Sequence, residues 1–398
     1  MVWFYLLSGL FLGWSLGANN AGNIFGTAVA TKMVRFKMAA LIGSIFIVLG
    51  AVFDGAGATH TLGKLGAVNA LAGSFTVALA AGVTVAWMTK LKIPVSASQS
   101  IVGAIIGWNL FTGLPTNYHS LTKILSAWVI CPLLSAAIAM ILFKLSKFLL
   151  SQRKIHLLEL DAYTRFGLIL VGAFGAYSLG ANNIANVMGV FVPAEPFQNI
   201  HFAGFLTFTG TQQLFLIGAL AIAVGIFTYS YRVMITVGSQ IFKLSPVTAF
   251  VVVLSESIVL FIFASEGLQN WLIAHGLPPI PLVPVSSSQA VVGAIIGIGI
   301  IKSHGSGINF NVLWKIGSGW ITTPIAAGVL SFVALFFVQN VFERPVVKRA
   351  ASEISQSVIE ERFRNRAGEG EFGEKVKRFS QELKHGQPFL YPVFGAQK

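Results

Sequence analysis

Long apolar stretches, separated by short polar ones, occupy the first 342 residues of the chain. A helix that crosses a bilayer needs about 17–25 predominantly apolar residues, and ten stretches approach or exceed this length. The pattern therefore predicts an all-α, polytopic protein with multiple spans in the cell (plasma or inner) membrane. The predicted membrane segments are 2–30, 38–53, 65–88, 94–112, 121–149, 164–192, 203–228, 246–264, 284–301 and 313–342.

The chain contains an internal repeat. Residues 15–26 (SLGANNAGNIFG) return at 178–189 (SLGANNIANVMG) with eight of twelve positions identical. Residues 94–107 (PVSASQSIVGAIIG) return at 284–297 (PVSSSQAVVGAIIG) with eleven of fourteen identical. We call the first pair the Asn motifs and the second pair the Ser motifs. Matched blocks in one order indicate a tandem duplication.

The two copies are predicted to cross the membrane in opposite directions, because each holds five candidate spans and five is odd. A third block, at 121–132 and 313–324, repeats Lys, Trp and Pro at matching places. The loop at 31–37 carries three basic residues, whereas its counterpart near 193–200 carries only Glu195. By the positive-inside rule, equivalent loops then lie on opposite sides. We expect inverted-topology repeats with a binding site near the midplane, where the halves meet.

The repeat divides the chain into four parts. These are a first transmembrane repeat at 1–149, a polar connector at 150–163, a second transmembrane repeat at 164–342 and a charged C-terminal tail at 343–398. The tail is partly helical by pattern. It is interpreted as a solvated appendage or a contact between copies of the chain, as in a homodimer, with a regulatory domain as the alternative.

Composition agrees with a membrane protein. Hydrophobic residues make up 55% of the chain and charged residues 10%, against roughly 25% charged in soluble domains. The net charge of +13 does not indicate nucleic-acid binding, because Lys and Arg cluster between apolar spans as in cytoplasmic loops. The single cysteine, Cys131, excludes a disulfide framework and is interpreted as a packing residue. The N-terminal apolar run lacks the features of a cleaved signal and is expected to be the first span.

The Ser motifs combine a proline with serines that favour the start of a helix. They predict a broken or re-entrant helix at membrane depth, whose N-terminal N–H groups and dipole point at an anion. Ser hydroxyls and the Gln amide add donors. An ordinary helix cap at a loop is the alternative. The candidate anion-binding residues are Ser96, Ser98, Gln99, Ser286, Ser287, Ser288 and Gln289.

The Asn motifs place amides inside apolar spans, where an unsatisfied amide is costly. Gly followed by consecutive Asn favours a break in the helix, which frees carbonyl oxygens for a cation such as Na⁺. Hydrogen bonding between helices is the alternative. The candidate residues for the coupling ion or the substrate are Asn19, Asn20, Asn23, Asn182, Asn183 and Asn186.

Two carboxylates lie in strongly apolar settings. Glu256, at mid-span, is the stronger candidate for a proton carrier or cation ligand, and Asp54, near a helix end, has an interfacial position as its alternative. Trp128 and Trp320 are interpreted as interfacial or packing residues. The sequence has no nucleophile–base pair, P-loop or metal-ligand spacing. We expect no enzyme, and no cofactor beyond a Na⁺ bound at the Asn motifs.

The two motifs, each present twice and in this order, resemble those of the inorganic phosphate transporter (PiT) family. In that family each half carries a sequence close to GANDxANA, followed by a PxSxTH or PxSxSQ element. The resemblance covers residues 1–342. It implies symport of phosphate, or of sulfate in some members, with Na⁺ or H⁺. It also implies that the Ser motifs hold the anion and the Asn motifs hold the cation.

The sequence departs from this family pattern at one place in each half. The usual Asp is Asn20 in the first copy and Asn183 in the second. The exchange weakens Na⁺ coordination and removes proton acceptors near the anion. Hydrogen phosphate must donate a proton, whereas sulfate only accepts hydrogen bonds, so a site of Ser, Gln and Asn favours sulfate. The sequence therefore predicts an ion-coupled sulfate permease, with a Na⁺- or H⁺-coupled phosphate symporter as the alternative.

A passive anion channel is a rival of another class, because aquaporin-type channels also carry paired Asn motifs at half-helix N-termini. Two different motif pairs and buried carboxylates are more than a pore needs. A structural scaffold would leave the duplicated polar motifs without a purpose. The sequence therefore favours a secondary active transporter that works by alternating access.

Overall fold

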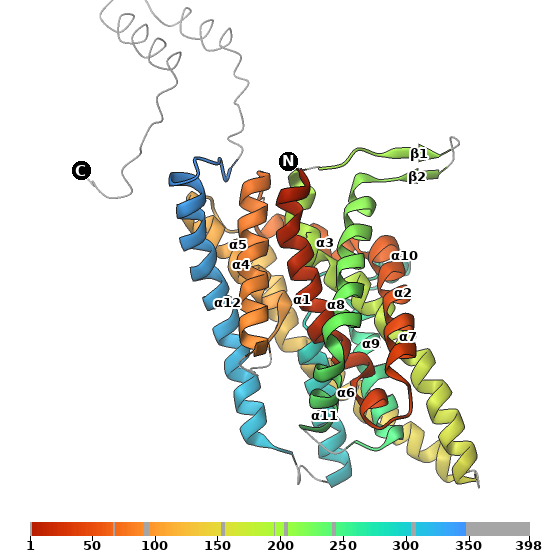
Figure 1. The fold of residues 1–398 in the computed structure, drawn as a ribbon. Helices are drawn as coiled ribbons and strands as arrows, with labels where there is room; N and C mark the ends of the chain where they lie inside the picture. Colours follow the sequence, from red (N-terminus) through yellow and green to blue (C-terminus); the bar gives the residue numbers. More distant parts are fainter. Residues whose placement is uncertain are drawn as a thin grey trace, which may run out of the picture. The chain divides into compact units, whose positions relative to one another are not determined.

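The described part of the chain is almost entirely helical in the computed structural model (Figure 1). The structure describes residues 2–66, 68–90, 95–152, 156–194, 196–202, 206–240, 244–303 and 308–347. Pro94, Glu195 and the tail beyond residue 347 lie outside the described residues.

Six helices form the first half. They are α1 (Val2–Ala30), α2 (Phe36–Asp54), α3 (Ala56–Leu65), α4 (Leu71–Lys90), α5 (Ala97–Thr112) and α6 (Tyr118–Ser151). The second half contains α7 (Leu157–Met188), the 3-10 helix η1 (Gly189–Ala194), α8 (Gly210–Gln240), α9 (Pro246–Ile262), α10 (Glu266–Ala274), α11 (Ser287–Ser303) and α12 (Phe310–Asn340). A short antiparallel hairpin of β1 (Ile200–Phe202) and β2 (Leu206–Phe208) precedes α8, with Ile200 opposite Phe208.

The helices refine the ten candidate stretches suggested by hydropathy. Among the described residues, six helices are long and apolar enough to cross a membrane, or seven if α9 and α10, bent by 67°, form one broken span. The helices α5 and α11 have only 16 and 17 residues, because each begins at a Ser motif instead of at the membrane surface. The predicted span at 203–228 begins later, since part of the hairpin occupies its first residues.

The two halves are interleaved. The helix that follows each Ser motif packs against the last helix of the opposite half, so α5 lies on α12 and α11 lies on α6. The helices of the Asn motifs are likewise shared, with α1 against α8 and α7 against α2. Residues Met1–Val347 consequently form one compact unit, and neither half has its own separate core.

Glycines allow the closest of these contacts, and they do so at equivalent positions. A Cβ added at Gly103 of α5 would collide with the carbonyl oxygen of Pro324 on α12, and one added at Gly293 of α11 would collide with that of Pro132 on α6. Small residues permit this close backbone approach in membrane helix packing. The pairing of equivalent glycines with equivalent prolines supports the inverted-repeat arrangement.

Positive charge gathers at one end of the bundle, the lower end in Figure 1. The C-terminal ends of α1, α6 and α11 lie there, together with the first turns of α7 and α12, and α4 ends above them in the lower half of the bundle. By the positive-inside rule this is the cytoplasmic end. The basic residues at these helix ends and in the adjoining loops are Lys32, Arg35, Lys37, Lys90, Lys144, Lys147, Arg165, Lys302 and Lys315.

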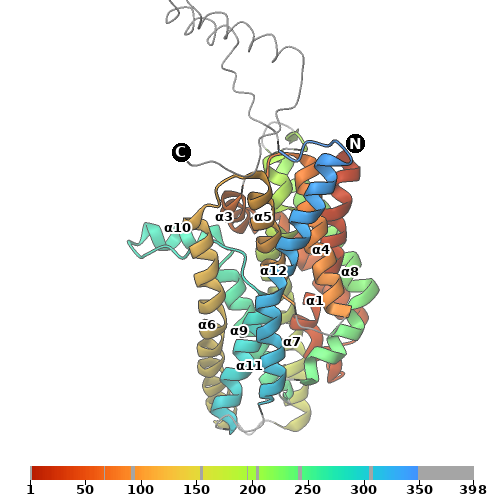
Figure 2. The same ribbon diagram turned by 90° about the vertical axis from the view of Figure 1, so that its left-hand side faces the viewer.

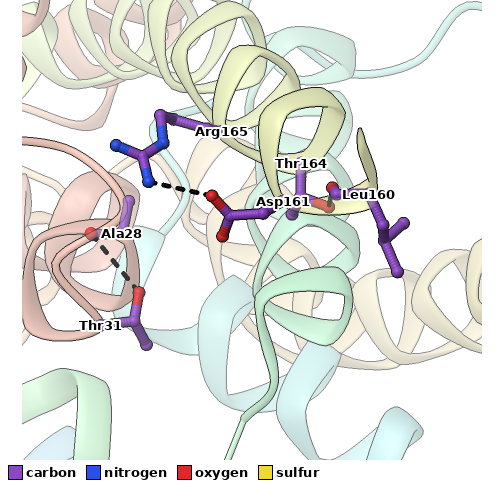
Figure 3. A network of polar contacts seen from close by, with 6 residues as sticks. All are labelled: Ala28, Thr31, Leu160, Asp161, Thr164 and Arg165. Atoms are coloured by element: carbon purple, nitrogen blue, oxygen red, sulfur yellow. Dashed lines mark hydrogen bonds and ion pairs between the residues drawn. The ribbon is translucent and has the colours of Figure 1, made fainter. Parts of the chain in front are cut away.

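Polar contacts at this end are local. Figure 3 shows the first turns of α7 near the end of α1, where Arg165 pairs with Asp161 at 3.0 Å. Thr164 donates to the carbonyl of Leu160, and Thr31 donates to that of Ala28. The pair of Arg165 and Asp161 is exposed and one turn apart, so it contributes little stability and lies away from the duplicated motifs.

Candidate functional site

The two Ser motifs meet face to face through a reciprocal pair of hydrogen bonds. Ser98 Oγ donates to the carbonyl of Val285 at 2.9 Å, and the equivalent Ser288 Oγ donates to the carbonyl of Val95 at 3.2 Å. Residues 95–98 and 285–288 occupy matching places in the repeat. The starts of α5 and α11 therefore lie side by side in the interior, although they are nearly 190 residues apart in the chain.

Both motifs start helices as predicted. Ser96 caps α5 by accepting a hydrogen bond from the N–H of Gln99 at 3.3 Å, and Ser286 accepts from the N–H of Gln289 at 3.4 Å. From their starts the two helices run to opposite ends of the bundle (Figure 2). Their dipoles therefore both direct positive potential at the shared centre. Every predicted anion-binding residue is buried except Ser288, which is half-buried.

The Asn motifs hold the Ser motifs of the opposite half. Asn186 Nδ2 on α7 donates to Ser98 Oγ at 2.9 Å, and Asn23 Nδ2 on α1 donates to Ser287 Oγ at 2.6 Å. Asn186 also donates to the side-chain oxygen of Asn183 at 3.0 Å. The structure thus brings the two predicted groups of residues into one cluster between the halves.

The helix break expected at the Asn motifs is wrong. The helices α1 and α7 continue through both motifs, so their backbone carbonyls take part in helical hydrogen bonds and are not freed for a cation. The glycines serve packing instead: a Cβ at Gly17 would collide with the carbonyl of Ile222, and one at Gly180 would collide with that of Ile47. Any cation at these motifs must therefore be held mainly by side chains.

Asn182 and Asn19, although equivalent, hold their neighbouring segments unequally. Asn182 is fully buried, donates to the carbonyl of Val283 at 3.0 Å and accepts from the N–H of Val285 at 2.9 Å. Asn19 is half-buried, donates to the side-chain oxygen of its neighbour Asn20 at 3.2 Å and makes one long contact of 3.5 Å with the carbonyl of Val95. Asn182 thus holds Val283 and Val285 by two good hydrogen bonds, whereas Asn19 holds Val95 by a marginal one.

Several polar atoms in this cluster have no hydrogen-bond partner among the described residues. They are Gln99 Oε1, Gln289 Oε1, Asn186 Oδ1, Asn183 Nδ2 and both carboxylate oxygens of Glu256. A buried polar atom without a partner costs about 1–3 kcal/mol, so such a cluster indicates a place for a ligand. Oxygens outnumber nitrogens in this set, and hard cations prefer oxygen ligands.

The structure places the two candidate carboxylates differently. Glu256 on α9 is fully buried, and the hydroxyl of Ser287 interacts with its carboxylate, although neither oxygen meets the geometry of a hydrogen bond. It therefore lies beside the second Ser motif. Asp54 is half-buried and accepts a hydrogen bond of 2.7 Å from the hydroxyl of Tyr177. In the described part of the chain, no hydrogen bond joins Asp54 to either motif.

Two further candidates were not identified as polar site residues from the sequence. The indole nitrogens of Trp128 on α6 and Trp320 on α12 are buried and lack a partner among the described residues. A buried indole N–H normally finds an acceptor. These tryptophans occupy equivalent positions in the third repeated block, on the helices that support α11 and α5. The sequence signal that could have identified them was the retention of Trp at the same place in both copies of this block.

Comparison with known proteins places these features in a family. A model described as "Phosphate transporter family" matches residues 16–269 and 281–384. The match includes both Asn motifs and both Ser motifs, and it extends beyond residue 342 into the predicted tail.

Individual relatives agree with the family match. A protein of Methanocaldococcus jannaschii named "Putative phosphate permease" is 28% identical over 82% of this chain and 95% of its own length. A Haemophilus influenzae protein of the same description is 24% identical over 86% of this chain and 97% of its own length. A solved structure described as "The sodium-dependent phosphate transporter" has the same fold, with a TM-score of 0.67, 22% identity and coverage of 85% of this chain and 98% of that one.

Proposed function

The chain belongs to the phosphate transporter family, and we propose that it is a secondary transporter that carries inorganic phosphate across the membrane together with Na⁺. The observation that carries this proposal is the meeting of the two Ser motifs, with Ser98 bonded to Val285 and Ser288 bonded to Val95. Two helix N-termini and a set of unpartnered amides converge there from opposite halves. Such a point between inverted repeats is where transporters bind their cargo.

Phosphate is favoured over sulfate for a reason that the sequence did not reveal. The sulfate preference rested on the loss of a proton acceptor where the family has Asp and this chain has Asn20 and Asn183. Glu256 supplies a carboxylate beside Ser287, and this group can accept the hydrogen bond that hydrogen phosphate donates. The names of the relatives also favour phosphate, and no comparison favours the sulfate permease branch.

Na⁺ is the proposed coupling ion because of the chemistry of the free oxygens. Gln99 Oε1, Gln289 Oε1, Asn186 Oδ1 and the carboxylate of Glu256 are buried acceptors without partners in the described structure. Amide and carboxylate oxygens suit a hard cation. A cation there would offset the negative charge of the substrate and that of Glu256. The name of the solved neighbour, which includes sodium, agrees with this assignment.

The proposed mechanism follows from the reciprocal hydrogen bonds between the two Ser motifs. The hydroxyls of Ser98 and Ser288 now donate to backbone carbonyls of the opposite motif. Substrate would take these donors, together with the free N–H groups at the starts of α5 and α11. The unequal contacts of Asn182 and Asn19 support alternating access: the equivalent residues of the two repeats are in different states, which transport would exchange.

Uptake into proteoliposomes tests this proposal. We expect radiolabelled phosphate to accumulate against its gradient when Na⁺ is imposed outside, and not when K⁺ replaces it. Equilibration without accumulation would instead indicate a channel. Phosphate uptake that a large excess of sulfate leaves unchanged would exclude a shared sulfate site, whereas Na⁺-driven sulfate accumulation without phosphate uptake would overturn the phosphate assignment.

A matched set of variants separates the site from general damage. The double change of Ser98→Ala and Ser288→Ala removes both reciprocal hydroxyls and is expected to raise the apparent KM for phosphate at least tenfold, by analogy with the cost of losing buried hydrogen bonds. Ser318→Ala, at an exposed serine of α12 that bonds only to its own helix, is the control and should leave uptake unchanged.

A further inference from the structure

A polar cavity, distinct from the cluster of Ser and Asn motifs, lies at the end of the bundle opposite the basic one. It has a volume of about 890 Å³ and is formed by α3, the start of α6, α10 and the segment before α11. Figure 2 shows α3, α10 and the upper end of α6 gathered at this end. The residues of the cavity that carry the argument are His60, Lys64, His119, Lys123, Glu266 and Asn270. Because the opposite end is the basic, cytoplasmic one, this cavity faces the outside.

The cavity is electropositive. Lys64 and Lys123 are exposed and form no hydrogen bond or ion pair in the described part of the chain. Glu266 is the one acid that lines the cavity, and it stands against two lysines and two histidines. Positive side chains in a concave surface concentrate the field and raise the local concentration of anions.

The placement of these lysines runs against the general charge pattern of the chain. Lysine and arginine are otherwise gathered at the cytoplasmic helix ends, as the positive-inside rule requires. At the outer end of the described structure, the basic residues are Lys64, Lys123 and Arg344, and two of the three line the cavity. The positive-inside rule does not account for lysines at the outer end, so we look for a local role for Lys64 and Lys123.

The cavity adjoins the transport site. Leu282 lines it, and Thr61 fastens that residue by donating to its carbonyl at 2.5 Å. The next residue, Val283, is the one that Asn182 holds by its carbonyl. Helix α6 begins at the cavity and contacts α11 further along its length, where Ser135 donates to the carbonyl of Ala290 at 2.6 Å. One fastened segment therefore separates the cavity from the Ser motifs.

We propose that this cavity is an outer collecting site for the transported oxyanion, in which Lys64 and Lys123 attract phosphate before the segment at 282–285 opens. The inference rests on the proposed function, and it adds a second site for the same anion. The cavity is far larger than one phosphate ion, so it holds the anion in hydrated form by its field instead of by close ligands. Its contribution is to the rate of substrate capture and not to the transport step.

Phosphate uptake at varied ionic strength tests the proposal. For the double change of Lys64→Gln and Lys123→Gln we expect the apparent KM to rise on the order of tenfold at low salt, as for loss of electrostatic steering, with the maximal rate unchanged. Added inert salt should raise the KM of the parent protein and have little effect on the variant, because screening removes the same field. An unchanged KM and unchanged salt dependence in the variant would overturn the proposal, as would a loss confined to the maximal rate.

Two control variants are provided by the chain itself. Lys315 is the equivalent of Lys123 in the third repeated block and lies at the cytoplasmic end, so Lys315→Gln removes the same charge from the other side. Arg344→Gln removes a charge from the outer end but outside the cavity. Both should keep the parent KM for uptake from outside. A rise of KM in the controls equal to that in the double variant would contradict a site at the cavity.

A labelling experiment measures the potential without relying on transport. Asn270→Cys places a thiol at the cavity, and the single native cysteine, Cys131, is fully buried. The measured quantity is the ratio of the labelling rate of an anionic methanethiosulfonate reagent to that of a cationic one. We expect this ratio to be several-fold higher with Lys64 and Lys123 present than after both are changed to Gln. Equal ratios would overturn the inference. If the parent protein carries no phosphate but the labelling ratio is as expected, the proposed function fails while the anion-attracting cavity stands.

Discussion

The side-chain amide of Asn186 donates a hydrogen bond of 2.9 Å to the hydroxyl of Ser98, a residue of the opposite repeat. Through this contact the Asn motif of one half positions the Ser motif of the other. The hydroxyl of Ser98 in turn donates to the carbonyl of Val285. A single chain of hydrogen bonds thus joins α7, the start of α5 and the start of α11.

Asn186→Ala should weaken substrate binding. The change leaves Ser98 Oγ without its donor and removes an amide whose oxygen has no partner in the described structure. Loss of one buried hydrogen bond costs about 1–3 kcal/mol, so we expect the KM for phosphate to rise roughly tenfold or more by that principle, measured by uptake in proteoliposomes. Asn340→Ala, at an exposed asparagine of α12 that bonds only to its own helix, should not change KM. An unchanged KM in Asn186→Ala would contradict the positioning role.

Glu256→Gln should alter coupling. The carboxylate is fully buried beside Ser287 and has no hydrogen-bond partner among the described residues, and intramembrane carboxylates commonly bind or carry the coupling ion. We expect Na⁺-driven accumulation to fall at least tenfold, in line with the cost of losing a charged ligand, while exchange of labelled for unlabelled phosphate persists. Glu159→Gln, at an exposed position of α7, is the control. If Glu256→Gln keeps the same accumulation and Na⁺ dependence, the carboxylate has no part in coupling.

Alanine at Gly103 or Gly293 should destabilise the protein. In either place the new Cβ would collide with a carbonyl of the supporting helix, that of Pro324 or Pro132. Overpacking typically costs about 1–3 kcal/mol, so the midpoint of thermal unfolding in detergent should fall by several degrees for each variant. Gly317→Ala is the matched control, because no atom lies within 4 Å of its added Cβ. Equal midpoints for all three would show that the helices separate without cost.

Asn182 and Asn19 offer a comparison of two equivalent residues. Asn182→Ala breaks two buried hydrogen bonds to backbone, at 3.0 and 2.9 Å. Asn19→Ala breaks one long contact to backbone of 3.5 Å and a partly buried hydrogen bond of 3.2 Å to the side chain of Asn20. We expect Asn182→Ala to lower the free energy of unfolding by about 1–3 kcal/mol and Asn19→Ala by less than about 1 kcal/mol. Thermal unfolding measures the difference. A larger loss for Asn19→Ala would contradict the inequality of the two contacts.

Local sequence chemistry was sufficient to predict where the special helices begin. A serine that accepts the N–H of the residue three positions later stabilises a helix start wherever the chain places it, so Ser96 and Ser286 marked the starts of α5 and α11 correctly. The duplication could likewise be read directly from repeated letters. Together with hydropathy they predicted the fold class and the inverted repeat without any knowledge of contacts, and the resemblance of the motifs to the PiT family predicted a transporter of that family.

Predictions that depended on neighbours were less successful. Gly17 and Gly180 suggested broken helices, yet both helices are continuous, because the glycines are used for contact with Ile222 and Ile47 on other helices. Among the described residues six or seven helices have the length and hydropathy of a full span, against ten candidate stretches, since hydropathy does not distinguish a short helix that begins in mid-membrane from one that crosses it. The importance of Trp128 and Trp320 emerged only when their indole nitrogens proved to be buried without partners among the described residues.

The sequence by itself determined the duplication, the helix starts at the two Ser motifs and the class of protein, because these depend on residues that are neighbours in the chain. Only the tertiary structure decided that Asn186 meets Ser98, that Glu256 lies beside Ser287 and that Lys64 and Lys123 share a cavity. Each of these pairs joins distant segments, whose meeting depends on how the interleaved helices pack. The proposed cargo changed for the same reason: the carboxylate proposed to accept the hydrogen bond of phosphate is not at the positions of Asn20 and Asn183, but is Glu256, on a helix that packing brings beside Ser287.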